Sequence, residues 1–168
     1  MRQYRRSRLL TIWLLALVGT IGFDLLLHAG ILAPLYSVQT PFLLSPEEAF
    51  RRIPLGYLSF ATLTGLLLWL MVMIRIQGWR SGLAFGIAFG ALVWGSLTLG
   101  LYSIATAGPA LLIGWFLGQT VELGLAGMVL GIGLGANRIR PLLVKVLLFF
   151  AAMLVLAIVL QNILGSPA

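Results

Sequence analysis

The chain of 168 residues contains no cysteine, one histidine and only four acidic residues. The absence of cysteine excludes disulfides, zinc sites built from thiolates and cysteine-held iron–sulfur clusters. Charged residues make up 9% of the chain, whereas a soluble domain carries about 25%. A chain this poor in charge is not organised around a soluble domain.

Apolar residues are abundant instead: 61% of the chain is hydrophobic. They form five runs, at about 9–31, 53–76, 82–104, 110–134 and 142–164. At about 1.5 Å per helical residue, each run is long enough to cross roughly 30 Å of hydrocarbon. We therefore expect an all-α, polytopic membrane helix bundle of five transmembrane helices, forming a single membrane domain over residues 1–168.

Basic residues gather on one side of the expected bundle. Nine of the eleven fall there: Arg2, Arg5, Arg6, Arg8, Arg75, Arg80, Arg138, Arg140 and Lys145. The positive-inside rule then puts the N-terminus in the cytoplasm and, after five spans, the C-terminus outside. Because these residues lie in short segments that flank the membrane, we expect the cell (inner or plasma) membrane as the location and no nucleic-acid partner.

The segment 32–52 is the one long connection, and we expect it on the outer side. Ser45 can cap a helix that begins at Pro46, where proline is favoured, and two acids follow in its first turn. We expect a short interfacial helix. Its charged residues could form ion pairs of modest strength or a docking surface; they are Glu47, Glu48, Arg51 and Arg52.

Glycines recur every four residues in two of the expected helices. The first set is Gly82, Gly86 and Gly90, and the second is Gly127, Gly131 and Gly135. Four-residue spacing puts each set on one helix face, where another backbone can approach closely. We expect these two faces to meet each other. The alternatives are a homo-oligomer, a lipid tail or a helix of another subunit in the groove.

Three ionisable residues lie inside apolar runs: Asp24, His28 and Glu122. Ionisable groups within a bilayer are costly, so they usually face the bundle interior and mark functional sites. Asp24 and His28 are one turn apart and share a helix face. Trp115, Gln119 and Glu122 share a face of the fourth span, and a contact between the first and fourth spans is geometrically allowed.

This polar cluster has three interpretations. It could be a hydrogen-bond network that fixes helix packing, a proton or ion path, or the site of a bound lipid, quinone or isoprenoid. Tyr102 is a further candidate for it. We predict no cofactor, and no metal site either, because two or three such ligands fall short of the usual coordination.

A family resemblance rests on two stretches. The first is Phe23-Asp24-Leu25-Leu26-Leu27-His28-Ala29 followed by Tyr36, and the second is the glycine-spaced third span and the fourth span with Trp115, Gln119 and Glu122. Over about residues 10–135 the chain resembles a group of short, uncharacterised bacterial integral membrane proteins that have an Asp-x-x-x-His element near the end of helix one. The resemblance implies a fold and no activity.

The sequence offers no nucleophile with an acid and base pair, so we expect a non-enzymatic protein. The favoured hypothesis is an accessory or structural subunit that packs against other membrane subunits, or a homo-oligomer, among membrane lipids. The alternative is a small transporter or carrier of protons or of a lipid-soluble ligand that uses Asp24, His28 and Glu122.

Overall fold

A computed structural model describes residues 5–36 and 41–164, and all regular structure in those residues is helical. The elements are α1 (Arg6–Leu25), the π-helical segment η1 (Leu26–Ile31), α2 (Ala33–Tyr36), α3 (Pro46–Met73), α4 (Trp79–Ile104), α5 (Pro109–Gly135) and α6 (Arg140–Leu164). Five of them, counting α1 with η1 as one, are long and apolar enough to cross a membrane. The expected fold class, an all-α bundle with five membrane-spanning helices, is confirmed.

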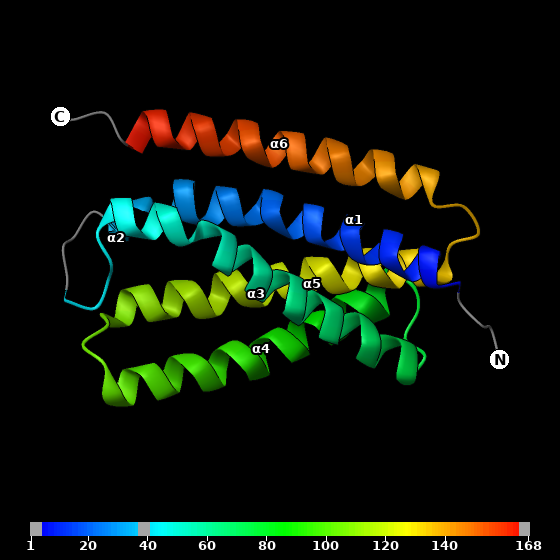
Figure 1. Cartoon of the computed structure of the whole chain (residues 1–168), viewed down its shortest axis with the longest axis horizontal. Helices are drawn as coiled ribbons and strands as arrows, with labels where there is room; N and C mark the ends of the chain where they lie inside the picture. The colour runs from blue at the N-terminus through cyan, green and yellow to red at the C-terminus, as the bar shows by residue number, and fades with distance from the viewer. Residues whose placement is uncertain (1–4, 37–40, 165–168) are drawn as a thin grey trace.

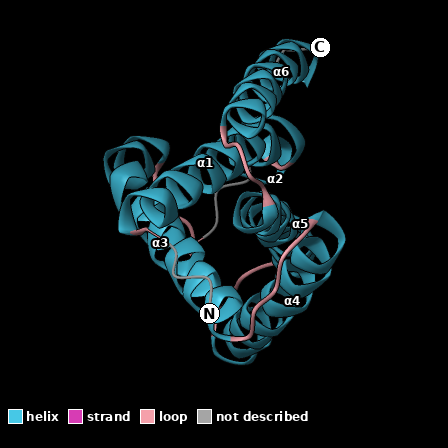
Figure 2. Cartoon of the chain, turned by 90° about the vertical axis from the view of Figure 1, so that its right-hand side faces the viewer, coloured by secondary structure: helices cyan, strands magenta, loops and turns pink. Residues whose placement is uncertain are grey.

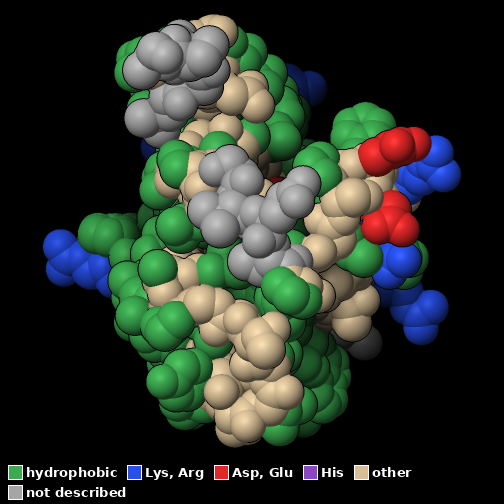
Figure 3. Space-filling model, turned by 90° about the vertical axis from the view of Figure 1, so that its left-hand side faces the viewer, with side chains coloured by type: hydrophobic (Ala, Val, Ile, Leu, Met, Phe, Trp, Pro, Cys, Tyr) green, Lys and Arg blue, Asp and Glu red, His purple; other side chains and the backbone are tan. Residues whose placement is uncertain are grey.

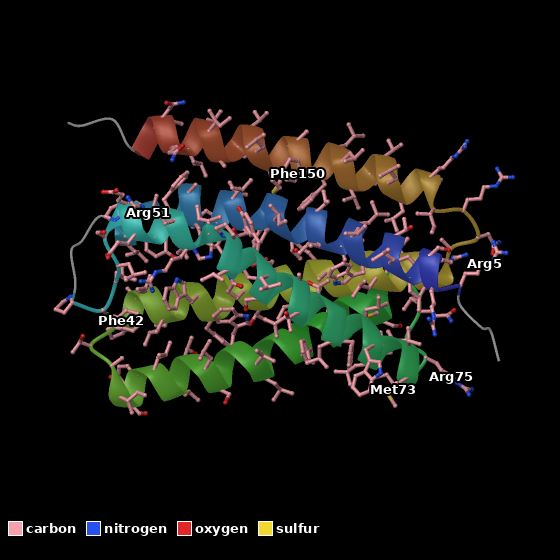
Figure 4. All side chains as sticks on the ribbon, in the orientation of Figure 1. Arg5, Phe42, Arg51, Met73, Arg75 and Phe150 are labelled. Carbon is pink, nitrogen blue, oxygen red and sulfur yellow. The ribbon has the colours of Figure 1, made fainter. Side chains whose placement is uncertain are left out.

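The long helices run side by side, and α3 crosses the others diagonally (Figure 1). Viewed along the bundle, α1 lies between α6 and the remaining helices (Figure 2). Arg5 and Arg75 lie at one end of the bundle, here called the basic end, and Phe42 and Arg51 lie at the other, here called the α2 end (Figure 4). Helix α1 starts at the basic end and α6 finishes at the α2 end.

The apolar core lies where α1, α3 and α5 meet. Ile12 of α1, Leu67 and Met71 of α3, and Leu130 and Leu134 of α5 are almost completely buried there. Since lipid is as apolar as these side chains, close packing rather than the hydrophobic effect holds such a core together. Where α1, α3 and α5 meet, the basic half of the bundle is therefore closely packed and mainly apolar.

The glycine faces of α4 and α5 meet each other. A Cβ atom at Gly82 would overlap the carbonyl oxygen of Gly127, and one at Gly86 would overlap that of Leu123. The two backbones are also joined directly, because Gly78 N–H donates a 2.8 Å hydrogen bond to the carbonyl of Gly131. The glycine faces of α4 and α5 are thus covered by each other's backbones within the chain.

Helix α6 packs along α1 and η1 and barely touches α5. A Cβ at Gly22 would lie 3.1 Å from the Cα of Phe150, and Figure 4 shows Phe150 between the two helices. Glycine at this position lets α6 approach α1 closely.

The expected separate interfacial helix is wrong. The segment 46–52 is not a separate interfacial helix but the first two turns of α3, which runs on through Pro54. Proline removes one helical N–H and crowds the carbonyl four residues before it, and Pro54 lies in the exposed first part of α3. Helix α4 begins at Trp79, slightly before its apolar run, whereas α5 begins at Pro109, within one residue of the expected start.

The start of α3 has the expected cap. The Ser45 hydroxyl accepts from Glu48 N–H at 3.4 Å and donates to the Glu48 carboxylate at 3.1 Å. Arg51 donates to Glu47 at 2.7 Å. With 28 residues, α3 is about 42 Å long, which exceeds the hydrocarbon thickness and fits its tilted course (Figure 1).

Candidate functional site

The site is built around His28, which lies in the π-helical segment η1. A π turn inserts one extra residue into a helix and is frequent at functional sites. Here it closes with a 2.7 Å hydrogen bond from Leu32 N–H to the carbonyl of Leu27. The chain then turns back as α2, which brings Tyr36 against the histidine.

Five side chains form one polar network. The His28 Nδ1 atom lies 2.5 Å from the hydroxyl of Tyr36, which accepts a 2.6 Å hydrogen bond from Trp115 Nε1. The other ring nitrogen, Nε2, lies 3.0 Å from the amide nitrogen of Gln119 and 3.3 Å from a carboxyl oxygen of Asp24. The expected contact between the first and fourth spans therefore exists, and it runs through His28.

The heavy-atom distances in this network allow two arrangements of the hydrogen atoms. In the first, Nε2–H donates to Asp24, the Tyr36 hydroxyl donates to Nδ1, and Gln119 turns its carbonyl toward the ring. In the second, Nδ1–H donates to Tyr36 and Nε2 accepts from Gln119. The lone pair of Nε2 then lies 3.3 Å from a carboxyl oxygen of Asp24, so Asp24 must carry a proton to avoid repulsion. The direction of the His28–Tyr36 bond is thus coupled to the proton on Asp24, as in a proton relay.

Glu122 lies beside this network without joining it. It is 1% exposed, and neither carboxyl oxygen has a hydrogen-bond partner among the described residues. Asp24 interacts electrostatically with Glu122. Both carboxyl groups also interact electrostatically with Tyr57 of α3. Among all the residues that the structure describes, the other buried side-chain polar atoms without a partner belong to Arg8, Thr64, Trp94 and Thr120.

The network borders a groove at the α2 end. Tyr36 and Trp115 line a space of about 350 Å³ together with Phe42, Leu44 and Pro46. Burial raises the pKa of Tyr36 to about 12; the hydrogen bond from Trp115 opposes this shift and the charge of Asp24 adds to it. Tyr36 therefore keeps its hydroxyl proton at every physiological pH.

Other candidates lie apart from the network. Tyr102 is 63% exposed and lines a separate groove of about 390 Å³ between α4 and α5. Glu47, Glu48, Arg51 and Arg52 are exposed at the start of α3, where acidic and basic side chains lie together at the α2 end (Figure 3). Gly135 lies at the edge of the glycine contact, since a Cβ there would meet Gly78 N at only 3.6 Å.

Sequence reasoning missed Tyr36 and Tyr57 as site residues. Tyr36 lies eight residues after His28, a spacing that brings no contact in a regular helix, and only the π turn and the reversal into α2 bring them together. The position of Tyr57 near the outer end of its apolar run is typical of an interfacial aromatic residue. Nothing in the sequence predicts its electrostatic interaction with Asp24 and Glu122.

No protein-family model, curated protein or solved structure matches this chain. Within the described residues, no three histidine, aspartate or glutamate side chains come together as metal ligands. The function of the site is therefore argued from its own geometry.

Proposed function

We propose that this chain is a small multi-pass membrane carrier whose Asp24, His28 and Glu122 exchange protons with water at the α2 end. The supporting observation is Glu122, a fully buried carboxyl group whose two oxygens find no hydrogen-bond partner among the residues that the structure describes. A carboxyl group that served only to fix helix packing would be expected to have a partner, because a buried polar group without one costs several kcal/mol by order of magnitude. Ionisable residues inside a membrane bundle commonly mark ion pathways and proton relays.

The geometry supports a route for protons. Tyr36 lines the groove at the α2 end and contacts His28, which in turn contacts Asp24. When Nδ1 of His28 takes a proton from the groove side, Nε2–H can pass its own proton to Asp24, so the ring relays without leaving its place. Asp24 and Glu122 interact electrostatically, and the proposal requires a proton to pass between these two carboxyl groups.

The basic half of the bundle favours a carrier over an open channel. Below Glu122 the buried residues are mainly apolar, such as Leu67 and Leu130, and the α4 and α5 backbones are in direct contact. A proton could cross this half only if the helices repacked. Together with the positive-inside rule, we propose a cell-membrane protein whose basic end is cytoplasmic and whose site opens outward.

Proton flux into liposomes tests the proposal. Purified protein is reconstituted around a pH-sensitive dye, an acid step is applied outside, and valinomycin with potassium removes the opposing potential. We expect faster internal acidification than in protein-free liposomes, reduced to that background by Glu122→Gln or His28→Gln. Glu47→Gln, which changes an exposed carboxylate, is the matched control and should keep the wild-type rate. Equal rates for wild type and Glu122→Gln would contradict the proposal.

The second candidate is an accessory subunit of a membrane complex. It is favoured by the exposed apolar faces of α3 and α6, with Phe50, Leu58 and Leu148 all more than half exposed. The glycine faces, which a glycine-zipper contact with a partner would use, are already filled within the chain. Native mass spectrometry after mild extraction distinguishes the two: a larger complex of fixed mass supports the subunit, and a lone chain supports the carrier.

The groove at the α2 end also fits a lipid-soluble ligand such as a quinone or an isoprenoid. Its walls are apolar and aromatic, and the Tyr36 hydroxyl offers a hydrogen bond at one edge. In that case the proton relay would serve the polar head of the ligand. The same mass spectra would then carry a small molecule bound to the chain, lost on Trp115→Ala.

A further inference from the structure

The basic end of the molecule carries positive charge that no acidic side chain of the chain opposes. The four acids are Asp24, Glu47, Glu48 and Glu122, and none of them lies in the segments at this end. The ion pairs among the described residues are His28–Asp24 and Arg51–Glu47, both toward the α2 end. Anions that neutralise the basic end therefore have to come from outside the chain.

A groove opens in the same half of the bundle, between α1, α5 and α6. Its volume is about 220 Å³, its walls are apolar side chains such as Met128, Val129 and Val146, and Gly19 forms part of its floor. Among the described residues, Lys145 on the second turn of α6 is the one charged residue that lines it. The groove exists because α6 rests on α1 and hardly touches α5.

An apolar groove with a cation at its rim matches the two halves of an anionic phospholipid. An acyl chain would lie against Val129 and Val146, and the long Lys145 side chain could reach a phosphate at the interface. Basic pockets between membrane helices on the cytoplasmic side bind anionic head groups by this combination. Arg138, just before α6, and Arg140, its first residue, are both exposed and add positive charge near the same rim.

We propose that the groove between α1, α5 and α6 is a binding site for an anionic phospholipid, with Lys145 holding the phosphate. A zwitterionic lipid offers the same acyl chains but no net charge, so it gains little from Lys145. The bound lipid fills the space between α5 and α6 and joins α6 to the rest of the bundle. This site is separate from the proton-exchange site and does not depend on it.

Native mass spectrometry of the detergent-solubilised chain, with dioleoyl-phosphatidylglycerol or dioleoyl-phosphatidylcholine added, tests the site. We expect one phosphatidylglycerol to be retained in preference to phosphatidylcholine, and Lys145→Gln to lower that retention about fivefold. Arg80→Gln removes an equal charge at the same end, from a side chain stacked on Trp79 outside the groove, and should leave retention unchanged. Equal losses in both variants, or equal retention of the two lipids, would overturn the proposal.

Substitutions at Gly19, which lines the groove, test whether the lipid binds there. A Cβ at Gly19 would meet Val129 and Val146 at an ordinary 3.9 Å, so Gly19→Ala should keep the lipid, whereas the longer side chain of Gly19→Leu should fill the groove and expel it. Thermal melting in phosphatidylcholine shows that both variants are folded, and if Gly19→Leu is not, the charge pair Lys145→Gln and Arg80→Gln decides. Folded Gly19→Leu that retains phosphatidylglycerol as wild type does would contradict the site.

Discussion

Tyr36 makes two hydrogen bonds with one hydroxyl group, one from Trp115 and one with His28. It links the groove at the α2 end to the buried histidine, so both the position and the protonation of Tyr36 matter for the site. In a regular helix residues eight apart lie about 12 Å apart along the axis and do not touch, which is why the contact of Tyr36 with His28 emerges only from the folded chain.

Tyr36→Phe should destabilise the protein by about 1–3 kcal/mol, because it leaves Trp115 N–H and a ring nitrogen of His28 unpaired. A second effect is alkaline. Burial raises the pKa of Tyr36 from 10.0 to about 12, so the stability that the neutral hydroxyl contributes is present below pH 10 and is lost as the pH rises from about 10 to about 12. Thermal melting across this range should show a steeper decline for wild type than for Tyr36→Phe; parallel curves would contradict the assignment.

Glu122→Gln should leave the melting temperature unchanged or raise it. Within the described part of the chain the carboxyl group makes no hydrogen bond, so its replacement by a neutral amide of similar shape removes a buried ionisable group and breaks no hydrogen bond seen there. The structural interpretation of the polar cluster requires the opposite, since it gives Glu122 a packing role. A loss of more than about 1 kcal/mol in Glu122→Gln would favour the structural interpretation.

At the scale of helices, α4 and α5 form the closest pair in the bundle, and the positions that allow it could be read from the four-residue glycine spacing. The cap of α3 by Ser45 could be read as well. What the sequence did not predict is that α3 continues without a break through Pro54, or that α1 ends in a π turn. Both depend on tertiary packing, which overrides local preference.

A matched pair of glycines tests the α4 and α5 contact. Alanine at Gly86 would put a Cβ into the Leu123 carbonyl, whereas at Gly100, near the end of α4, it would meet nothing within 4 Å. Gly86→Ala should therefore destabilise the protein by about 1–3 kcal/mol, and Gly100→Ala should be neutral or stabilising by up to roughly 1 kcal/mol. Equal melting temperatures for the two variants would show that the helices do not approach this closely.

For the whole molecule, the charge distribution and the site fit one orientation. The packed, apolar half lies at the basic end and the polar network lies toward the α2 end. The five spans followed from hydropathy alone, and part of the site followed from three ionisable residues in apolar runs. The closing of the network by α2 could not be predicted, because it depends on how a short connection folds back on the bundle.

The absence of cysteine allows a clean test of orientation. Ser7→Cys and Thr106→Cys place single thiols at exposed positions near the basic end and the α2 end. In intact cells, a membrane-impermeant maleimide should label Thr106→Cys at once and Ser7→Cys only after permeabilisation. The reverse pattern would invert the proposed topology and turn the site toward the cytoplasm.

The central claim is that Glu122 exchanges protons with water at the α2 end, and infrared difference spectroscopy during a pH step measures this directly. Only four side chains contribute carboxyl bands, so each can be assigned by substitution. We predict a carboxylic acid band that changes with external pH, is lost in Glu122→Gln and is retained in Glu47→Gln. A difference spectrum that Glu122→Gln leaves unaltered would contradict the account.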